Sequence, residues 1–150
     1  MKVTAPPLPE FEDEATLYSL ASEFLAAASV LANTSPTGIK YTLVTYYLAG
    51  HAAELMLKSF LFKHGDTIET LTKRYKHDLK LLVKQSRLKG LQSSVSTEQI
   101  QGFGNAYTSK RTEYRRNRDL CLPPLDLLLT EISTLKAHVF NFVAKFESGT

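Results

Sequence analysis

Apolar residues recur at helical spacing along most of this chain, beginning with residues 11–33. Acidic residues fill the first turn of that segment, where the helix dipole favours negative charge. We expect a helix over 11–33 whose buried stripe is formed by Leu17, Leu20, Phe24, Ala27 or Ala28, and Leu31. Ser35 followed by Pro36 predicts the start of a second helix, because serine caps helix ends and proline fits the first helical position.

Residues 39–64 are apolar around most of the helical circumference. A helix that is apolar on several faces is central and contacts several neighbours. Gly65 is well placed to end this helix, since glycine readily adopts the left-handed conformation of the position after a helix. A polar link follows, in which residues 68–75 could form a short helix.

Two helices are predicted in the next part of the chain. Asp78 is placed to cap a helix over 79–88, which Gly90 closes. Its buried stripe is expected to be Leu79, Leu82 and Val83. Ser96 and Gln99 have the spacing of a capping box and predict the start of a helix that continues to about residue 119.

The last helix is predicted over 125–146, after two prolines that interrupt the preceding helix. Its apolar stripe consists of Leu128, Ile132, Leu135, Val139, Phe142 and Val143. The absence of long alternating segments predicts an all-α fold, an up-and-down, mostly antiparallel bundle of four to five helices. At 150 residues the chain fits one domain. We expect that domain over 11–150, after a short N-terminal tail over 1–10.

Composition also bears on where the protein resides. The longest run without a charged residue, Phe24 to Ile39, has 16 residues. A membrane-spanning helix needs about 20, so no membrane span is expected. The single cysteine, Cys121, excludes an intrachain disulfide and fits a reducing compartment, which predicts a cytoplasmic protein. Because Cys121 lies at a predicted helix end, burial as a small apolar residue is favoured over a nucleophilic role.

The net charge of +3 is unevenly distributed along the chain. Residues 1–33 carry one lysine against five acids, a net charge of −4. Residues 73–118 carry twelve Lys and Arg residues against three acids, a net charge of +9. We therefore expect the basic surface on the second half of the fold.

Three polar residues interrupt the apolar central helix. His51, Glu54 and Lys58 lie on one stripe, and Glu54 and Lys58 can form an i,i+4 ion pair. In one interpretation this stripe faces solvent or a partner helix. In the other, a carboxylate on a buried helix orients a basic residue from another helix, because a buried charge is costly unless it is paired. The sequence leaves both interpretations open.

A basic run at residues 73–77 precedes the helix predicted over 79–88. Its lysines and His77 lie beside the free backbone N–H groups of a helix N-terminus, which could receive a phosphate. Charge runs are more often solvated surface, and His77 could instead only help to cap the helix.

The strongest polar pattern lies on the helix expected over 96–119. Its members share one basic and aromatic stripe: Tyr107, Arg111, Tyr114, Arg115 and Arg118. Arginine binds phosphate bidentately and tyrosine stacks on unpaired bases, so the stripe is typical of a surface for single-stranded RNA. The alternative places the tyrosines in the core and pairs the arginines with acids such as Glu54. Core packing is favoured for Tyr107, and the role of the arginines stays open.

No metal or cofactor is expected. The four histidines lack carboxylate or cysteine companions at zinc-like spacing, and the sequence has no HExxH or CxxC motif. It also has no phosphate-binding Gly-x-x-x-x-Gly-Lys loop and no serine nucleophile elbow.

Three segments resemble successive helices of bacterial HEPN-like proteins. They are residues 46–58 (YYLAGHAAELMLK), 76–82 (KHDLKLL) and 114–117 (YRRN), and the resemblance spans about 40–119. It implies an α-helical bundle that commonly dimerises. The family includes many metal-independent ribonucleases of toxin–antitoxin, phage-defence and RNA-processing systems. The resemblance also implies that Glu54 is the helix acid that contacts an arginine, here Arg115.

The chain departs from this family at its catalytic motif, an arginine followed four to six residues later by a histidine. Arg111, Arg115, Arg116 and Arg118 match the arginine, but no histidine follows at that distance. The next one, His138, lies 20 residues beyond Arg118. Tyr114 or His77 could substitute for the missing histidine geometrically, although nothing in the sequence favours either.

We therefore expect an atypical or non-catalytic HEPN-like protein, a homodimer, that presents an arginine-rich groove to RNA, a nucleotide or a protein partner. The candidate phosphate and RNA contacts are Arg111, Tyr114, Arg115, Arg118 and His77, supported by a polar network of His51, Glu54 and Lys58. One alternative is a metal-independent ribonuclease that acts as a toxin or defence factor. Another is an interaction module that pairs with a nucleotidyltransferase-type antitoxin.

Overall fold

The computed structural model describes residues 13–34, 42–108 and 122–148, with side chains described as far as residue 143. These residues form α1 (Glu14–Ala32), α2 (Thr42–Lys63), the π-helical segment η1 (Thr70–Tyr75), α3 (Leu79–Leu88), α4 (Glu98–Thr108) and α6 (Leu125–Ser148). None of them forms a strand. The predicted all-α helical bundle is confirmed, and η1 lies within the short helix suggested at 68–75.

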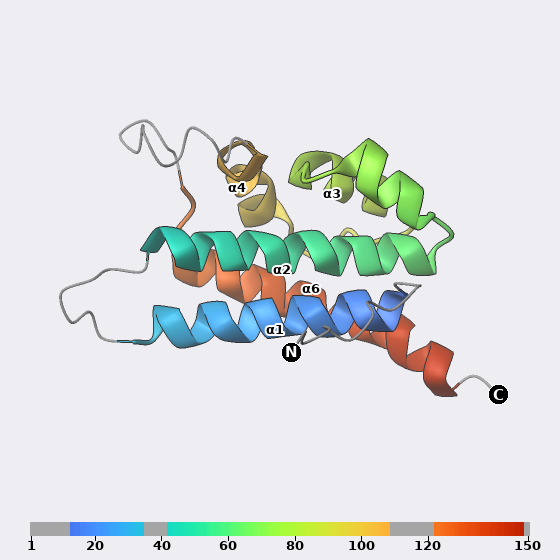
Figure 1. Ribbon diagram of the computed structural model, residues 1–150, viewed down its shortest axis with the longest axis horizontal. Helices are drawn as coiled ribbons and strands as arrows, with labels where there is room; N and C mark the ends of the chain where they lie inside the picture. Colours follow the sequence, from blue (N-terminus) through green and yellow to red (C-terminus); the bar gives the residue numbers. More distant parts are fainter. Residues whose placement is uncertain (1–12, 35–41, 109–121, 149–150) are drawn as a thin grey trace, which may run out of the picture.

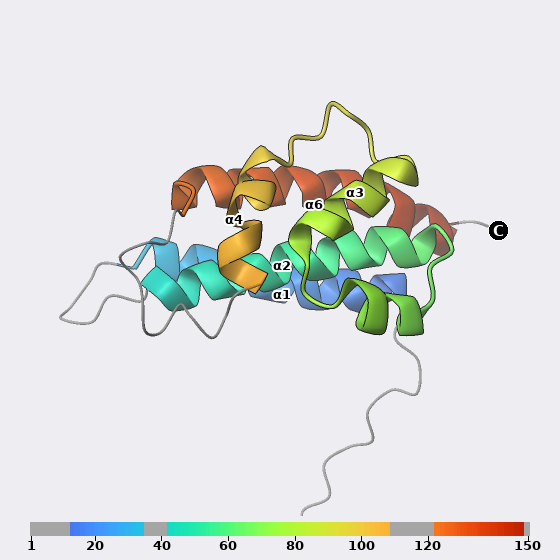
Figure 2. The ribbon, with the colours of Figure 1, turned by 90° about the horizontal axis from the view of Figure 1, so that it is seen from above.

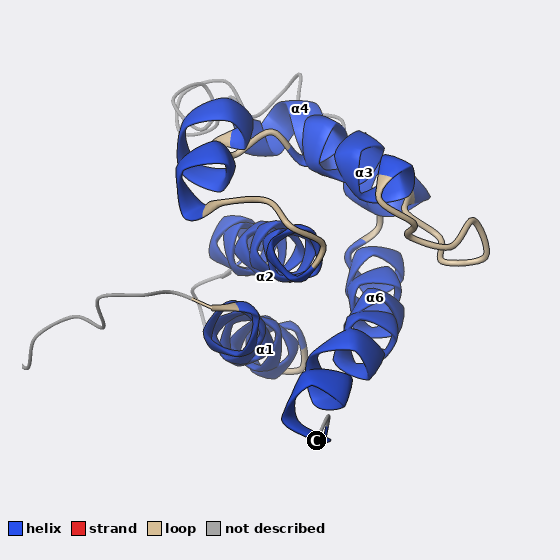
Figure 3. Cartoon of the chain, turned by 90° about the vertical axis from the view of Figure 1, so that its right-hand side faces the viewer, coloured by secondary structure: helices blue, strands red, loops and turns tan. Residues whose placement is uncertain are grey.

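The central helix of the bundle is α2, as its apolar circumference predicted. It contacts α1, α3, α4 and α6. Figure 3, an end-on view, shows α1 on one side of α2 and the layer of α3 and α4 on the other. Figures 1 and 2 show that α1 is antiparallel to α2 and to α6. The helices α2 and α6 run in the same direction, because the chain returns between them through the shorter α3 and α4.

One apolar core joins these helices. Its largest fully buried side chains are Tyr75, Tyr107, Phe60, Met56, Leu57, Leu61, Leu79, Leu82, Ile100, Leu128, Ile132 and Leu135. The stripes predicted for α3 and α6 are buried as expected, except that Phe142 is only partly buried. Burial of these stripes supplies the main driving force for packing the helices together.

The buried face of α1 differs from the predicted one. Leu17, Ala21, Leu25 and Ala28 are buried, whereas Leu20 is 41% exposed. Alanines around the helix make its faces similarly apolar, so contact with α2 and α6 decides which face is buried. The prediction that Leu20 belongs to the core was therefore wrong.

By length and composition alone, α1 could cross a membrane. Core helices of soluble proteins pass the same test. Here α1 packs along α2 and α6. This packing is compatible with the predicted absence of a membrane span.

Several helix ends follow the local signals of the sequence. The Asp78 carboxylate caps α3 by accepting a hydrogen bond from the Leu81 N–H at 3.0 Å. Gly65 and Gly90 follow α2 and α3 with φ angles of 106° and 110°, a conformation that favours glycine. The predicted Asp78 cap and the two predicted glycine helix ends are confirmed. Residues 35–41, where the start of the second helix was predicted, lie outside the described residues.

The N-terminus of α4 is capped by another helix, so the predicted capping box was wrong. The Ser96 hydroxyl donates to Glu131 Oε2 at 3.1 Å instead of accepting from the Gln99 N–H. Glu131, on α6, accepts from the Gln99 N–H at 3.0 Å and from the Ile100 N–H at 2.9 Å. It is only 7% exposed. A carboxylate from α6 therefore satisfies the free N–H groups of α4, where the helix dipole favours negative charge.

We expect Glu131→Gln to lower the free energy of unfolding by about 2 kcal/mol, because an amide replaces charge-assisted hydrogen bonds to buried N–H groups. Glu98→Gln is the matched control, since Glu98 is an exposed acid in the first turn of the same helix. It should change stability by about 0.5 kcal/mol. Urea unfolding measures both, and equal losses would contradict capping from α6.

Candidate functional site

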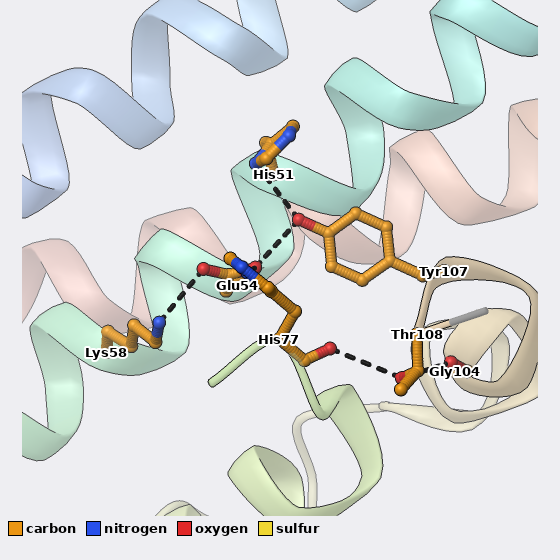
Figure 4. A network of polar contacts seen from close by, with 7 residues as sticks. All are labelled: His51, Glu54, Lys58, His77, Gly104, Tyr107 and Thr108. Carbon is orange, nitrogen blue, oxygen red and sulfur yellow. Dashed lines mark hydrogen bonds and ion pairs between the residues drawn. The ribbon is translucent and has the colours of Figure 1, made fainter. Parts of the chain in front are cut away.

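A buried carboxylate on α2 is the meeting point of three elements. Glu54 is 3% exposed. Its Oε2 accepts from Lys58 Nζ at 2.9 Å, and its Oε1 accepts from the Tyr107 hydroxyl at 2.7 Å and from His77 Nδ1 at 2.8 Å (Figure 4). The donors come from α2, from α4 and from the turn before α3. These three donors offset the cost of burying the charge of Glu54. Without them, the buried carboxylate would be strongly destabilising.

The same contacts keep Glu54 ionised. Burial raises the pKa of its carboxyl and is the largest single effect. The positive charge of Lys58, together with hydrogen bonds from Tyr107, Lys58 and His77, outweighs it, so the pKa lies below its ordinary value of 4.5. Lys58 is itself 8% exposed. The predicted Glu54–Lys58 ion pair therefore forms, and it forms inside the protein.

Tyr107 and His51 extend this network toward α1. The Tyr107 hydroxyl lies 3.0 Å from His51 Nδ1, and the His51 ring stacks on Phe24 of α1 with centroids 5.2 Å apart. Because the hydroxyl donates to Glu54, His51 Nδ1 serves as the donor to the hydroxyl oxygen. Gly50 makes room for the Tyr107 ring, since a Cβ at that position would lie 2.4 Å from a ring carbon.

His77 reaches Glu54 from a tight turn. The Asp78 N–H donates to the Tyr75 carbonyl at 2.9 Å and closes the turn. Lys76 has φ 48° and ψ −119°, which fits the first central position of a type II′ turn. That position strongly favours glycine, and a side chain there costs about 1–3 kcal/mol. The strained residue immediately precedes the histidine that it helps to direct toward Glu54.

The turn leaves the His77 side chain 54% exposed. The Thr108 hydroxyl donates to the Gly104 carbonyl within α4 at 2.8 Å and shares its proton with the His77 carbonyl at 3.3 Å, which links the turn to α4 (Figure 4). A carboxylate at Nδ1 favours the tautomer that carries a proton on Nδ1 and a lone pair on Nε2. His77 can therefore present Nε2 as a proton acceptor or, once protonated, as a donor to an anion.

Exposed basic residues surround His77 in the sequence, namely Lys73, Arg74 and Lys76. Lys73 pairs with Glu69 at 3.0 Å, and both side chains are exposed. The Arg74 guanidinium lies 5.6 Å from the centre of the Tyr75 ring. The surface at this turn is therefore basic, and the acid that pairs with His77 is the buried Glu54.

The structure brings together His51, Glu54, Lys58 and His77, which the sequence had placed in two separate features. His77 does not cap α3, because Asp78 does. Tyr107 packs in the core as expected, but its link to Glu54 was missed. The signal was available, since a buried tyrosine hydroxyl needs a hydrogen-bond partner. Outside the described residues lie Arg111, Tyr114, Arg115, Arg118 and Cys121, and with them the implied contact of Arg115 with Glu54.

Comparison with known proteins gives no match to a family model, a curated protein or a solved structure. Within the described ranges, no three His, Cys, Asp or Glu side chains are grouped as metal ligands. The chemistry of the site therefore rests on its own geometry.

We expect Glu54→Gln to lower the free energy of unfolding at pH 7 by about 3 kcal/mol, because it leaves Lys58 buried without a counter-charge. Adding Lys58→Met to that variant should recover part of the loss. The lowered pKa of Glu54 contributes stability that is present above pH 4.5 and is lost as the pH falls through the folded-state pKa. The gap between wild type and Glu54→Gln should therefore narrow toward pH 3, and a constant gap in urea unfolding would contradict this assignment.

Lys76→Gly should leave the protein as stable as wild type or more stable by about 1 kcal/mol, because it relieves the positive φ angle. Lys84→Gly removes an exposed lysine from the interior of α3 and should cost about 1 kcal/mol. Thermal and urea unfolding of the two variants give the comparison. Equal destabilisation by both glycines would show that Lys76 is not strained.

Proposed function

We propose that this chain is an atypical HEPN-like protein that binds RNA through the basic turn at His77 and the arginine-rich segment that follows α4. The residues that carry the resemblance include Glu54, Lys58 and His77, and both Lys58 and His77 hydrogen-bond to Glu54. The helical bundle that holds them is of the kind that the resemblance implies. The proposal also includes the expected homodimer.

The observation that carries the proposal is the way in which Glu54 holds His77. A buried acid with three donors fixes one edge of a half-exposed imidazole, and the backbone before it is strained. A histidine that served only as solvated surface would require none of these features. Strained backbone and a directed side chain are typical of binding and catalytic sites. The neighbouring lysines and Arg74 attract the phosphates of a nucleic acid.

Metal-independent RNA cleavage is the second candidate, and the Glu54–His77 pair is the observation that favours it. With Nδ1 bound to Glu54, the Nε2 atom of His77 could accept the proton of a ribose 2′-hydroxyl. The 2′ oxygen would then attack phosphorus, the bond to the 5′ oxygen would break, and that oxygen would take a proton from solvent. The products would be a 2′,3′-cyclic phosphate and a 5′-hydroxyl end.

The test is binding and cleavage of labelled single-stranded RNA in EDTA at two salt concentrations. We expect affinity that falls with salt. His77→Ala and Arg115→Ala should each weaken it by about tenfold or more, the loss of one charge-assisted contact. Lys89→Ala removes the same charge as Arg115→Ala from an exposed position at the end of α3 and should change affinity by about twofold or less.

Cleavage in EDTA that disappears in His77→Ala and Glu54→Gln would establish the ribonuclease. A folded wild-type protein without RNA affinity would contradict both candidates and direct attention to a protein partner of the antitoxin type. Equal losses of RNA affinity in Lys89→Ala and Arg115→Ala would show that RNA is held only by general charge attraction. That result would overturn the assigned site.

A further inference from the structure

A pocket of about 420 Å³ lies between α3 and α4, beside the turn that holds His77. It is lined by Asp78, Lys80, Leu81, Lys84, Gly104, Asn105 and Thr108. Of the lining residues, Gly104 and Thr108 are labelled in Figure 4. The network around Glu54 does not include the lysines of this pocket, so the pocket is a separate feature of the same region.

Two lysines dominate the charge of the pocket. Lys80 and Lys84 are one helical turn apart on α3, and both are exposed. Neither has an ion-pair partner among the described residues, unlike Lys58, Lys63 and Lys73. The one acid in the lining, Asp78, already accepts the hydrogen bond that caps α3. The lining therefore carries a net positive charge, which favours an anion.

Gly104 gives one of these lysines a defined course. A Cβ at Gly104 would lie 2.9 Å from Lys80 Cγ and 3.4 Å from its Cε, so the aliphatic part of Lys80 lies directly against α4. Glycine inside a helix costs about 1 kcal/mol relative to alanine. At Gly102, two residues earlier, an added Cβ would meet nothing within 4 Å. An added Cβ would therefore displace Lys80 at Gly104 and would displace no residue at Gly102.

We propose that this pocket binds a terminal phosphate group. The two lysines supply charge-assisted hydrogen bonds, and the Asn105 amide supplies a neutral one. A phosphate monoester carries a charge of about −1.5 to −2 at pH 7, whereas an internal phosphodiester carries about −1. Two ammonium groups without an ion-pair partner among the described residues therefore favour the monoester. The same chemistry occurs at the phosphorylated end of an RNA and in a free nucleotide.

This inference deepens the proposed RNA-binding function and rests on it for its biological meaning. Thr108 lines the pocket and also donates to the carbonyl of His77, so pocket and turn share a residue. The phosphorylated end of an RNA held in the pocket would lie beside the turn that presents His77. The pocket would then set the register of the RNA relative to the imidazole.

The experiment titrates adenosine 5′-monophosphate, inorganic phosphate and adenosine into the full chain and follows backbone amide NMR signals. We expect the monophosphate to shift signals of α3 and α4 and to bind at least about tenfold more tightly than adenosine, the worth of one charge-assisted contact. Lys80→Met and Lys84→Met should each weaken binding by about fivefold or more, while Lys89→Met, which removes the same charge, should change it by about twofold or less.

The glycine pair tests the geometry of the pocket. Gly104→Ala should weaken binding of the monophosphate, because it displaces Lys80, whereas Gly102→Ala should leave binding unchanged. The lysine variants keep the test decisive if Gly104→Ala does not fold. Equal binding of adenosine and its monophosphate, equal losses in all three lysine variants, or no shifts at α3 and α4 would each overturn the proposal.

RNA oligonucleotides with 5′-phosphate, 3′-phosphate or only hydroxyl ends separate the two sources of the phosphate. Tighter binding of one phosphorylated end, lost in Lys80→Met, would assign the pocket to RNA ends, and binding of the free monophosphate alone would assign it to a small phosphate ester. RNA with hydroxyl ends that binds in a His77-dependent way, without any monophosphate binding, would overturn the pocket and leave the proposed function standing. Binding of the monophosphate without any affinity for RNA would retain the pocket and reject the proposed function.

Discussion

A charged carboxylate inside an apolar helix bundle is stable only while its oxygens are hydrogen-bonded, and Glu54 imposes this condition on the whole central region. Lys58, Tyr107 and His77 meet it from α2, from α4 and from the turn before α3. These elements are consequently held in one arrangement relative to α2. Removing any one donor leaves part of the charge unsatisfied, which is far more costly than losing a contact at the surface.

The all-α bundle and most helix bounds could be predicted because they depend on local periodicity and helix-end signals. Asp78, Gly65 and Gly90 act as their types indicate. The failures arose where tertiary contacts decide. Packing selected Ala21 over Leu20 on α1, and Glu131 from a distant helix replaced the capping box that Ser96 and Gln99 suggested.

The candidate site was predictable in its parts and not in its assembly. The stripe of Glu54 and Lys58 is visible in the sequence, and so is a basic run that ends at His77. Nothing local indicates that His77 turns toward Glu54, because its turn places Lys76 in a conformation that lysine disfavours. Sequence propensity fails where strain is retained, and strain of this kind is typical of functional positions. The same turn, through Thr108, adjoins the lysine-lined pocket.

The proposed site depends on Glu54 fixing the tautomer and orientation of His77. Nitrogen-15 NMR of the neutral imidazole at alkaline pH measures this directly. We expect a neutral ring with its proton on Nδ1 and a free Nε2, and loss of that preference in Glu54→Gln. A ring protonated on Nε2, or one that averages between tautomers equally in both proteins, would show that Glu54 does not position His77 and would remove the basis of the proposed site.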